Sequence, residues 1–162
     1  MTAINKVDPE KSIKRAKNVR AKKKSWSLSV QNRNYTWETG MDRIEIIREK
    51  LPFESIETVS SKVDLPIKRL LELIGMPQTT YNKKLRERGL LSTHESELIL
   101  MMAELIEFGN HVFNEEQEKF TRWLKKPNLS LGGKTPESLF DSLTGIMEVR
   151  YCLNRIEYGN LA

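Results

Sequence analysis

Hydrophobic residues recur at helical spacing from about residue 40 onward. Ile44, Ile47 and Leu51 are separated by three and four positions, which places them on one face of a helix. Pro52 ends this helix because the residue before a proline is disfavoured in the helical region. The pattern therefore predicts a short helix over residues 41–50, and a second apolar stripe follows directly after it.

The longest apolar pattern begins at Ser92 or Thr93 and continues to Phe113. Its middle is apolar on more than one side, since residues such as Ile99 and Ala103 lie outside the first stripe. Burial on two sides requires a further layer, which is either another element of this chain or a second copy of it. A homodimer would cover an apolar patch that is otherwise exposed. Its expected contact residues are Leu98, Met101, Leu105 and Phe108.

Shorter helices are expected after Asn114. A charged helix stops before Pro127, and Thr135 caps the next helix, which has a proline at its first position. Gly145 interrupts that helix, and a last helix is expected from about residue 147 to 156. Since no strand pattern recurs and no repeat of fixed period is visible, the sequence predicts an all-α body.

Residues 1–40 do not share the helical pattern. Trp26, Leu28 and Val30 alternate with serines, and this period of two is typical of a short strand or an extended arm. Tyr35 and Trp37 follow within a few positions. Because such large aromatic side chains are costly to leave in water, we expect this segment to dock on the body or on a second subunit.

Positive charge is concentrated in the first 24 residues, where nine lysines and arginines stand against two carboxylates. The whole chain has a net charge of +5, so the rest of the chain is slightly acidic. A cationic arm on a near-neutral body is typical of a protein that binds a polyanion, through release of counterions from phosphates. Charge alone leaves open the alternative of a solvated tail without a partner.

The longest strictly apolar stretch, Leu98 to Ala103, is far shorter than the roughly 20 residues that cross a bilayer. No apolar run and small-residue cleavage site follow the charged N-terminus, as a secretory signal would require. The single cysteine, Cys152, forms neither an internal disulfide nor a metal cluster, and it is expected to pack in the core. The expected location is the cytoplasm, without a membrane.

Motifs of enzymes are missing from the sequence. His94 and His111 stand 17 positions apart with no cysteine between them, which is not the spacing of metal ligands. The glycines at 132 and 133 follow no strand pattern, whereas a phosphate-binding loop connects a strand to a helix. We therefore expect no catalytic residue, no metal and no cofactor.

The segment of residues 65–91 has the pattern of a helix-turn-helix. A helix ends at Gly75, a short turn ends at Pro77, and a basic helix follows, which in this motif enters the major groove of DNA. Tyr81 and Leu85 share one face, so the polar residues of that helix point the other way. A helical hairpin with a solvated basic face is the alternative. The expected DNA contacts are Lys68, Arg69, Gln78, Thr79, Asn82, Lys83, Lys84 and Arg86.

The C-terminal segment carries a W-L-x-x-P-N motif at residues 123–128 and a closing R-I-E-Y-G at residues 155–159. With these motifs it resembles the C-terminal domain of the Xre, MbcA and ParS antitoxins, which are the partners of RES-domain toxins. The helix-turn-helix stands upstream, where this family places its own. Further matching residues are Leu131, Gly133, Pro136, Leu139, Gly145, Val149 and Leu153.

The resemblance implies a cytoplasmic antitoxin of a bacterial type II toxin-antitoxin module. Antitoxins of this family form dimers, bind and repress their own operator, and cover the active site of a RES toxin, which consumes or transfers from NAD, with their C-terminal end. Arg150 and Asn154 give the last helix a polar, partly cationic face beside that end, and both are expected toxin contacts as well. The toxin contacts implied within the end itself are Arg155, Glu157, Tyr158, Gly159 and Asn160.

Together these observations predict an all-α fold that comprises a DNA-binding helix-turn-helix domain, a small helical toxin-binding domain and a basic, partly extended arm. A stand-alone transcriptional repressor without a toxin is the main alternative, since it would need the C-terminal domain for dimerisation or ligand sensing alone. An RNA-binding protein is less consistent with the sequence, because the aromatic sheet surface of common RNA modules is missing. The expected boundaries are residues 1–40 for the arm, 41–113 for the central domain and 114–162 for the C-terminal domain.

Overall fold

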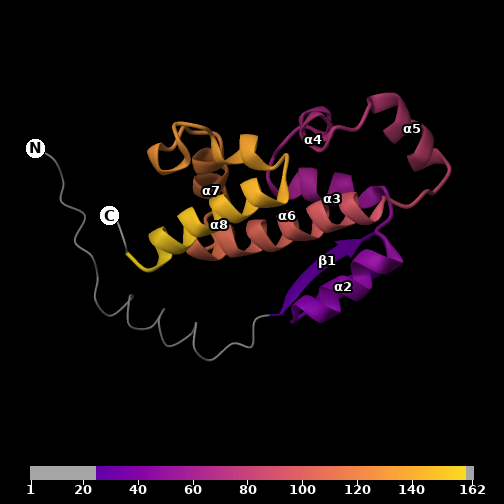
Figure 1. The fold of residues 1–162 in the computed structure, drawn as a ribbon, viewed down its shortest axis with the longest axis horizontal. Coiled ribbons are helices and arrows are strands. Elements are labelled where there is room, and N and C mark those ends of the chain that lie inside the picture. Colours follow the sequence, from indigo (N-terminus) through magenta and orange to yellow (C-terminus); the bar gives the residue numbers. More distant parts are fainter. Residues whose placement is uncertain (1–24, 160–162) are drawn as a thin grey trace, which may run out of the picture.

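The computed structural model describes residues 25–159 as a bundle of helices with a two-stranded sheet (Figure 1). The basic arm of residues 1–24 and the last residues, 160–162, lie outside the described part of the chain. Within residues 25–159, no helix is both long enough and apolar enough to cross a membrane. The predicted all-helical body is confirmed, with a hairpin added at its N-terminal side.

The alternating segment forms a β-hairpin of strands β1 (Trp26–Val30) and β2 (Arg33–Trp37). The strands pair antiparallel, with Trp26 opposite Trp37 and Val30 opposite Arg33. Leu28, Val30, Tyr35 and Trp37 are buried against the body and Trp26 is partly buried, while the alternating polar side chains largely face outward. The expectation that this segment is extended and docks on the body is therefore confirmed.

Helix α2 (Gly40–Glu49) follows the hairpin and begins with a capping box. The hydroxyl of Thr39 accepts a hydrogen bond from the backbone N–H of Asp42, and the carboxylate of Asp42 accepts one from the backbone N–H of Thr39. These reciprocal bonds satisfy donors that a helix N-terminus otherwise leaves unpaired. The helix ends at Lys50, two positions before Pro52, close to the predicted end.

Three short helices come next: α3 (Glu54–Lys62), α4 (Ile67–Ile74) and α5 (Gln78–Arg86). Gly75 ends α4 in the left-handed conformation with φ of 70°, which glycine adopts without steric cost. Pro77 then precedes α5 in extended conformation. The helix, glycine turn and second helix of the predicted motif are thus present at the predicted positions.

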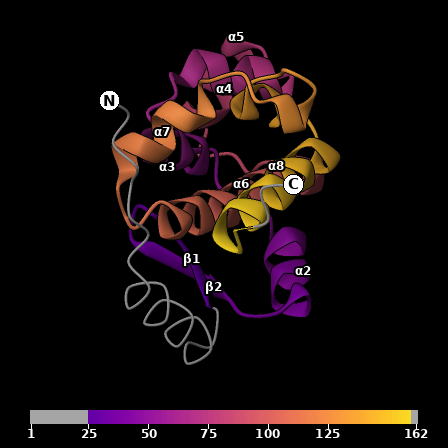
Figure 2. The ribbon, with the colours of Figure 1, turned by 90° about the vertical axis from the view of Figure 1, so that its left-hand side faces the viewer.

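The long helix α6 (Thr93–Val112) forms the centre of the molecule. Helices α3 and α8 pack on it from one side, and the hairpin and α2 pack from the other, as both ribbon views show (Figures 1 and 2). The predicted burial on two sides is therefore confirmed, and elements of the same chain provide the cover.

The expected dimer contact through α6 is wrong, because elements of the same chain already cover these residues. Leu98, Leu105 and Phe108 are buried inside the chain, and Met101 is partly buried against the core. The periodic pattern indicated that these residues are buried, but it did not show which element packs against them. They are core residues, and they offer no exposed apolar patch to a second copy.

The C-terminal part consists of α7 (Gln117–Leu124), two 3-10 turns, η1 (Leu129–Leu131) and η2 (Pro136–Leu139), and the helix α8 (Leu143–Glu157). Where a helix was predicted after Thr135, the chain forms one short turn. Ser142 caps the start of α8, and its hydroxyl accepts a hydrogen bond from the backbone N–H of Gly145.

Gly145 does not interrupt a helix, as the sequence had suggested, but lies buried in the first turns of α8. A Cβ atom at this position would stand 2.1 Å from the carbonyl oxygen of Leu139. The glycine is thus required for the close approach of η2 to α8. It is a packing residue rather than a helix breaker.

Candidate DNA-binding and partner-binding surfaces

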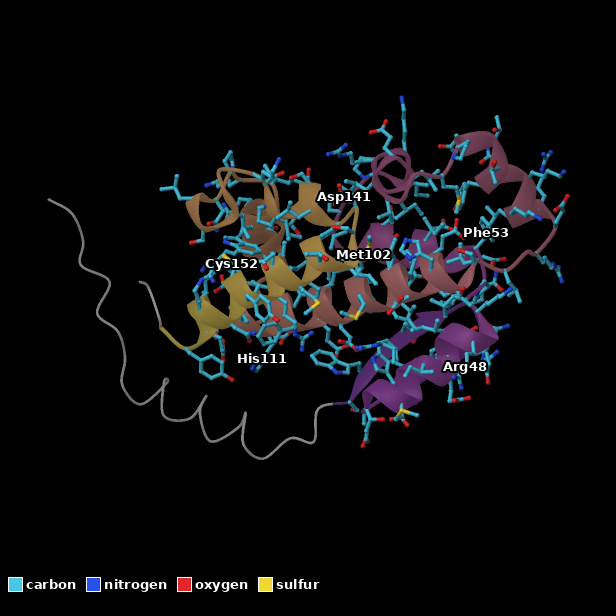
Figure 3. The ribbon with its side chains drawn as sticks, viewed as in Figure 1. Arg48, Phe53, Met102, His111, Asp141 and Cys152 are labelled. Atoms are coloured by element: carbon cyan, nitrogen blue, oxygen red, sulfur yellow. The ribbon has the colours of Figure 1, made fainter. Side chains whose placement is uncertain are left out.

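Packing beneath α5 fixes which side of this helix faces outward. Tyr81 is 4% exposed and packs on Phe53, with 6.4 Å between the ring centroids. Figure 3 places Phe53 at the end of the molecule that carries α5. Burial, reinforced by the carboxylates of Glu57 and Glu54, raises the pKa of the Tyr81 hydroxyl, so this group stays neutral. The opposite side of α5 is therefore held toward solvent.

All the predicted DNA-contact residues of α5 are exposed. The structure brings together on this helix Gln78, Thr79, Asn82, Lys83, Lys84 and Arg86. Lys68 and Arg69 lie in the first turn of α4, the preceding helix of the motif. Lys68 is exposed, and Arg69 is half-buried.

Several of these cations have local acidic partners. The ammonium groups of Lys83 and Lys84 lie 4.0 and 3.8 Å from the carboxylate of Glu87, and Arg69 lies 3.5 Å from Glu72. Exposed pairs of this kind are worth at most about 1 kcal/mol, so a phosphate can replace the carboxylate. The surface can therefore bind a polyanion, with Glu87 and Glu72 reducing its positive charge.

A second surface lies on α8, at the other end of the molecule. Met147, Tyr151 and Tyr158 are exposed along its outer face at helical spacing, and Tyr158 is 63% exposed. Leu129 in η1, which packs beside α8, is 95% exposed. Exposed apolar side chains gathered on one part of a protein mark a binding surface for another protein.

Sequence reasoning missed Met147 and Tyr151. The available signal was their spacing of four, on the side of the last helix opposite the buried Val149 and Leu153.

The predicted toxin contacts lie in different surroundings. Asn154 and Arg155 are half-buried, and Tyr158 and Gly159 are exposed at the end of α8. The carboxylate of Glu157 is mostly covered and lies 3.9 Å from Nε2 of His111. Asn160 lies outside the described residues.

Arg150, by contrast, turns toward a buried carboxylate on α6. Glu104 is 4% exposed, and its Oε2 lies 3.4 Å from a guanidinium nitrogen of Arg150. The Arg150 guanidinium also lies 5.4 Å above the ring of Trp26 and 5.2 Å above that of Phe108. These contacts hold Arg150 within the fold.

The same carboxylate joins the N-terminal elements to the bundle. Its Oε1 accepts from Nε1 of Trp37 over 2.5 Å and from the guanidinium of Arg43 over 2.6 Å. Glu104 thus connects β2, α2, α6 and α8. We call Glu104, Trp37, Arg43 and Arg150 the Glu104 cluster. One local signal of this cluster is visible in the sequence, a glutamate within an otherwise apolar stretch of α6.

Cys152 is buried, and its sulfur accepts a hydrogen bond from Nδ2 of Asn128 over 3.5 Å. Figure 3 places Cys152 and His111 in the half of the molecule away from α5. The expectation of a packing cysteine is confirmed. Among residues 25–159, no group of His, Cys, Asp and Glu side chains is arranged to hold a metal ion.

The fold and surfaces define a helix-turn-helix protein that carries a second, protein-binding domain. Residues 42–104 match the family described as the antitoxin Xre-like helix-turn-helix domain. Residues 109–159 match the antitoxin Xre/MbcA/ParS C-terminal toxin-binding domain.

Individual relatives agree with these two domains. The chain is 26% identical over 114 residues to "Antitoxin Xre" of Photorhabdus laumondii, which covers 70% of this chain and 77% of that protein. It is 23% identical over 116 residues to "Antitoxin Xre" of Yersinia enterocolitica, covering 72% and 78% of the two chains. It is 27% identical over 130 residues to "Prs ADP-ribosylating antitoxin" of a Sphingobium species, covering 75% and 82%.

The chain belongs to the Xre/MbcA/ParS-type antitoxins. It is a regulator built from two binding domains rather than an enzyme.

Proposed function

We propose that this antitoxin neutralises a RES-type, NAD-consuming toxin of a type II module and represses its own operon by binding operator DNA. The observation that carries the proposal is the presence of two unlike binding surfaces in one chain, the polar and basic face of α5 and the apolar face of α8. They lie toward opposite ends of the long axis (Figure 1), so each leaves room for a partner. Both partners belong to the bacterial cytoplasm.

The chemistry of the toxin is proposed from relatives. The name of the Sphingobium protein describes it as a Prs ADP-ribosylating antitoxin. ADP-ribosyl transfer uses NAD as its donor, which agrees with the NAD-consuming RES toxins implied by the motifs of residues 123–128 and 155–159.

For toxin contact we propose the outer face and the end of α8. Met147, Tyr151 and Tyr158 supply apolar area there, and aromatic anchors carry much of the energy of protein interfaces. Asn154, Arg155, Glu157, Gly159 and Asn160 supply polar contacts toward the active-site cleft of the toxin. Arg150 supports this face from within, through the Glu104 cluster.

For operator contact we propose the exposed side of α5 and the first turn of α4. Lys68, Arg69, Lys83, Lys84 and Arg86 contact phosphates, which gives affinity, while Gln78, Thr79 and Asn82 face base edges, which gives specificity. The basic arm of residues 1–24 adds charge contacts that do not depend on sequence.

We further propose that the operator-bound form is a homodimer, which would present two recognition helices to a pseudo-palindromic site. Because the apolar residues of α6 are buried, a different surface has to form the contact. Met41 and Ile44 are exposed on α2 and are the candidates. Light scattering at micromolar concentration tests this, since a monomer in the presence and absence of operator would contradict the dimer.

Two assays test the proposed function. The purified chain should stop NAD consumption by the toxin encoded beside it at a near-stoichiometric ratio, and it should shift a duplex from its own promoter in a gel. Changing Lys83 and Arg86 together to alanine should weaken that shift at least several-fold, each good contact being worth about 1–3 kcal/mol. Operator binding without any effect on a toxin would favour the stand-alone repressor instead.

A further inference from the structure

Two amide side chains form a pair of their own on the outward side of α5. Nε2 of Gln78 donates a hydrogen bond to Oδ1 of Asn82 over 3.1 Å, one helical turn further on. Both side chains are exposed, and the buried ring of Tyr81 prevents the helix from rotating them inward. The pair lies in the N-terminal half of α5, and that half of a recognition helix contacts base edges.

We propose that Asn82 reads an adenine in the major groove and that Gln78 is the positioning residue that holds it; this inference rests on the proposed DNA-binding function of α5. Adenine presents there the acceptor N7 and the donor N6–H₂. Asn82 matches both atoms, because Nδ2 can donate to N7 while Oδ1 accepts from N6. The Gln78 bond uses one lone pair of Oδ1 and leaves the other for N6.

The donors and acceptors of Asn82 do not match those of guanine. Guanine presents two acceptors, O6 and N7, which call for two donors, as arginine or lysine provides. Asn82 in this orientation would set its own carbonyl oxygen against O6. The arginine next along this face, Arg86, donates instead from Nε to the backbone oxygen of Asn82 over 3.3 Å, along its own helix.

The inference can be tested by selecting bound sequences from randomised duplexes with the full-length chain. Each adenine that the selection holds fixed is then replaced by 7-deazaadenine, which keeps Watson–Crick pairing but lacks the N7 acceptor. At one position in each half-site this change should weaken binding at least about 5-fold, and Asn82→Ala should weaken binding by about 5- to 140-fold. The two changes combined should add little to the larger one, because they remove the same contact.

Gln78→Ala tests the positioning role. It should relax the preference for adenine at that same position by a smaller factor while the salt dependence of binding stays unchanged, since no charge is removed. Thr80→Ala on the same helix is the matched control and should leave the base preference intact.

The possible results distinguish failure of the adenine contact from failure of the proposed DNA-binding function. Specific binding that neither Asn82→Ala nor 7-deazaadenine alters would overturn the adenine contact and leave the DNA-binding role standing. No preference for any duplex sequence would overturn both.

Discussion

The outward faces of α5 and α8 differ in the polarity and the interactions of their exposed side chains. On α5 the exposed side chains are polar or cationic, and several of them bond within the helix or pair with Glu87. On α8 the exposed stripe consists of Met147, Tyr151 and Tyr158, which gain most from leaving water. The first face suits a hydrated, charged ligand whose binding depends on salt, and the second suits a protein partner.

The two faces also have different connections to the core. The face of α5 is held by the local packing of Tyr81, whereas α8 is tied through Arg150 to Glu104, which also holds the hairpin and α2. Removing a local contact should therefore affect one surface, and removing Glu104 should affect the whole molecule.

The largest effect is expected from Glu104→Ala. It leaves Arg43, Arg150 and the indole N–H of Trp37 without their shared acceptor. Breaking a buried ionic network from one side typically costs several kcal/mol, and the partial exposure of both arginines brings our expectation to about 2–4 kcal/mol. Urea unfolding measures it, with Glu97→Gln on the same helix as the control, expected to cost less than about 1 kcal/mol. Equal losses for the two variants would contradict the role of the cluster.

A smaller but more specific effect is expected from Tyr151→Ala. If α8 is the toxin-binding face, loss of this aromatic side chain should weaken toxin binding by about 2 kcal/mol, or roughly 30-fold, without changing operator affinity. Leu90→Ala removes an exposed apolar side chain outside the C-terminal domain and should change neither. Calorimetric titration with the toxin measures the difference, and unchanged binding would remove α8 from the interface.

Glu87→Gln is expected to strengthen DNA binding by the face of α5. The change removes the carboxylate beside Lys83 and Lys84, so affinity for DNA should rise by about 2- to 5-fold at low ionic strength and the gain should fade as salt is added. Glu49→Gln makes the same charge change on α2, away from α5, and is the control. A gain that persists at high salt would contradict the electrostatic explanation.

The smallest expected effect concerns the ring that anchors α5. The raised pKa of Tyr81 means that, above the ordinary tyrosine pKa of about 10, the unfolded chain ionises while the folded one stays neutral. The free energy of unfolding should therefore decline as pH rises through that range, with no contribution from this group at lower pH. Tyr81→Phe should show a shallower decline in urea midpoints; an identical decline would show that Tyr81 is not the group responsible.

Local patterns were sufficient for most of the helices and for the hairpin. The alternation from Trp26 to Val30 and the glycine and proline around the turn at 75–77 act through their own neighbours, so the sequence shows them directly. Gly145 was misread because its role depends on Leu139, which reaches it through tertiary packing.

Long-range partners were not predictable from the pattern. Leu98, Leu105 and Phe108 were recognised as residues that leave water, but the hairpin that helps to cover their helix lies some 60 or more positions earlier. Glu104 meets Arg43 and Arg150 from 61 and 46 positions away. Local spacing in the sequence does not show contacts between residues so far apart. For this reason the sequence did not predict that Arg150 turns inward to Glu104.

The assignment of toxin and DNA to separate surfaces is best tested by assaying two multiple variants for both functions. The first variant carries Tyr151→Ala together with deletion of residues 158–162. The second variant carries both Lys83→Ala and Arg86→Ala. Each is assayed for inhibition of NAD consumption by the toxin and for binding of operator DNA. We predict that the first variant no longer inhibits the toxin but still binds operator DNA. The second variant should still inhibit the toxin but no longer bind operator DNA. If both functions fail together in either folded variant, or if the truncated chain inhibits as well as the full-length one, the assignment of toxin and DNA to separate surfaces is wrong.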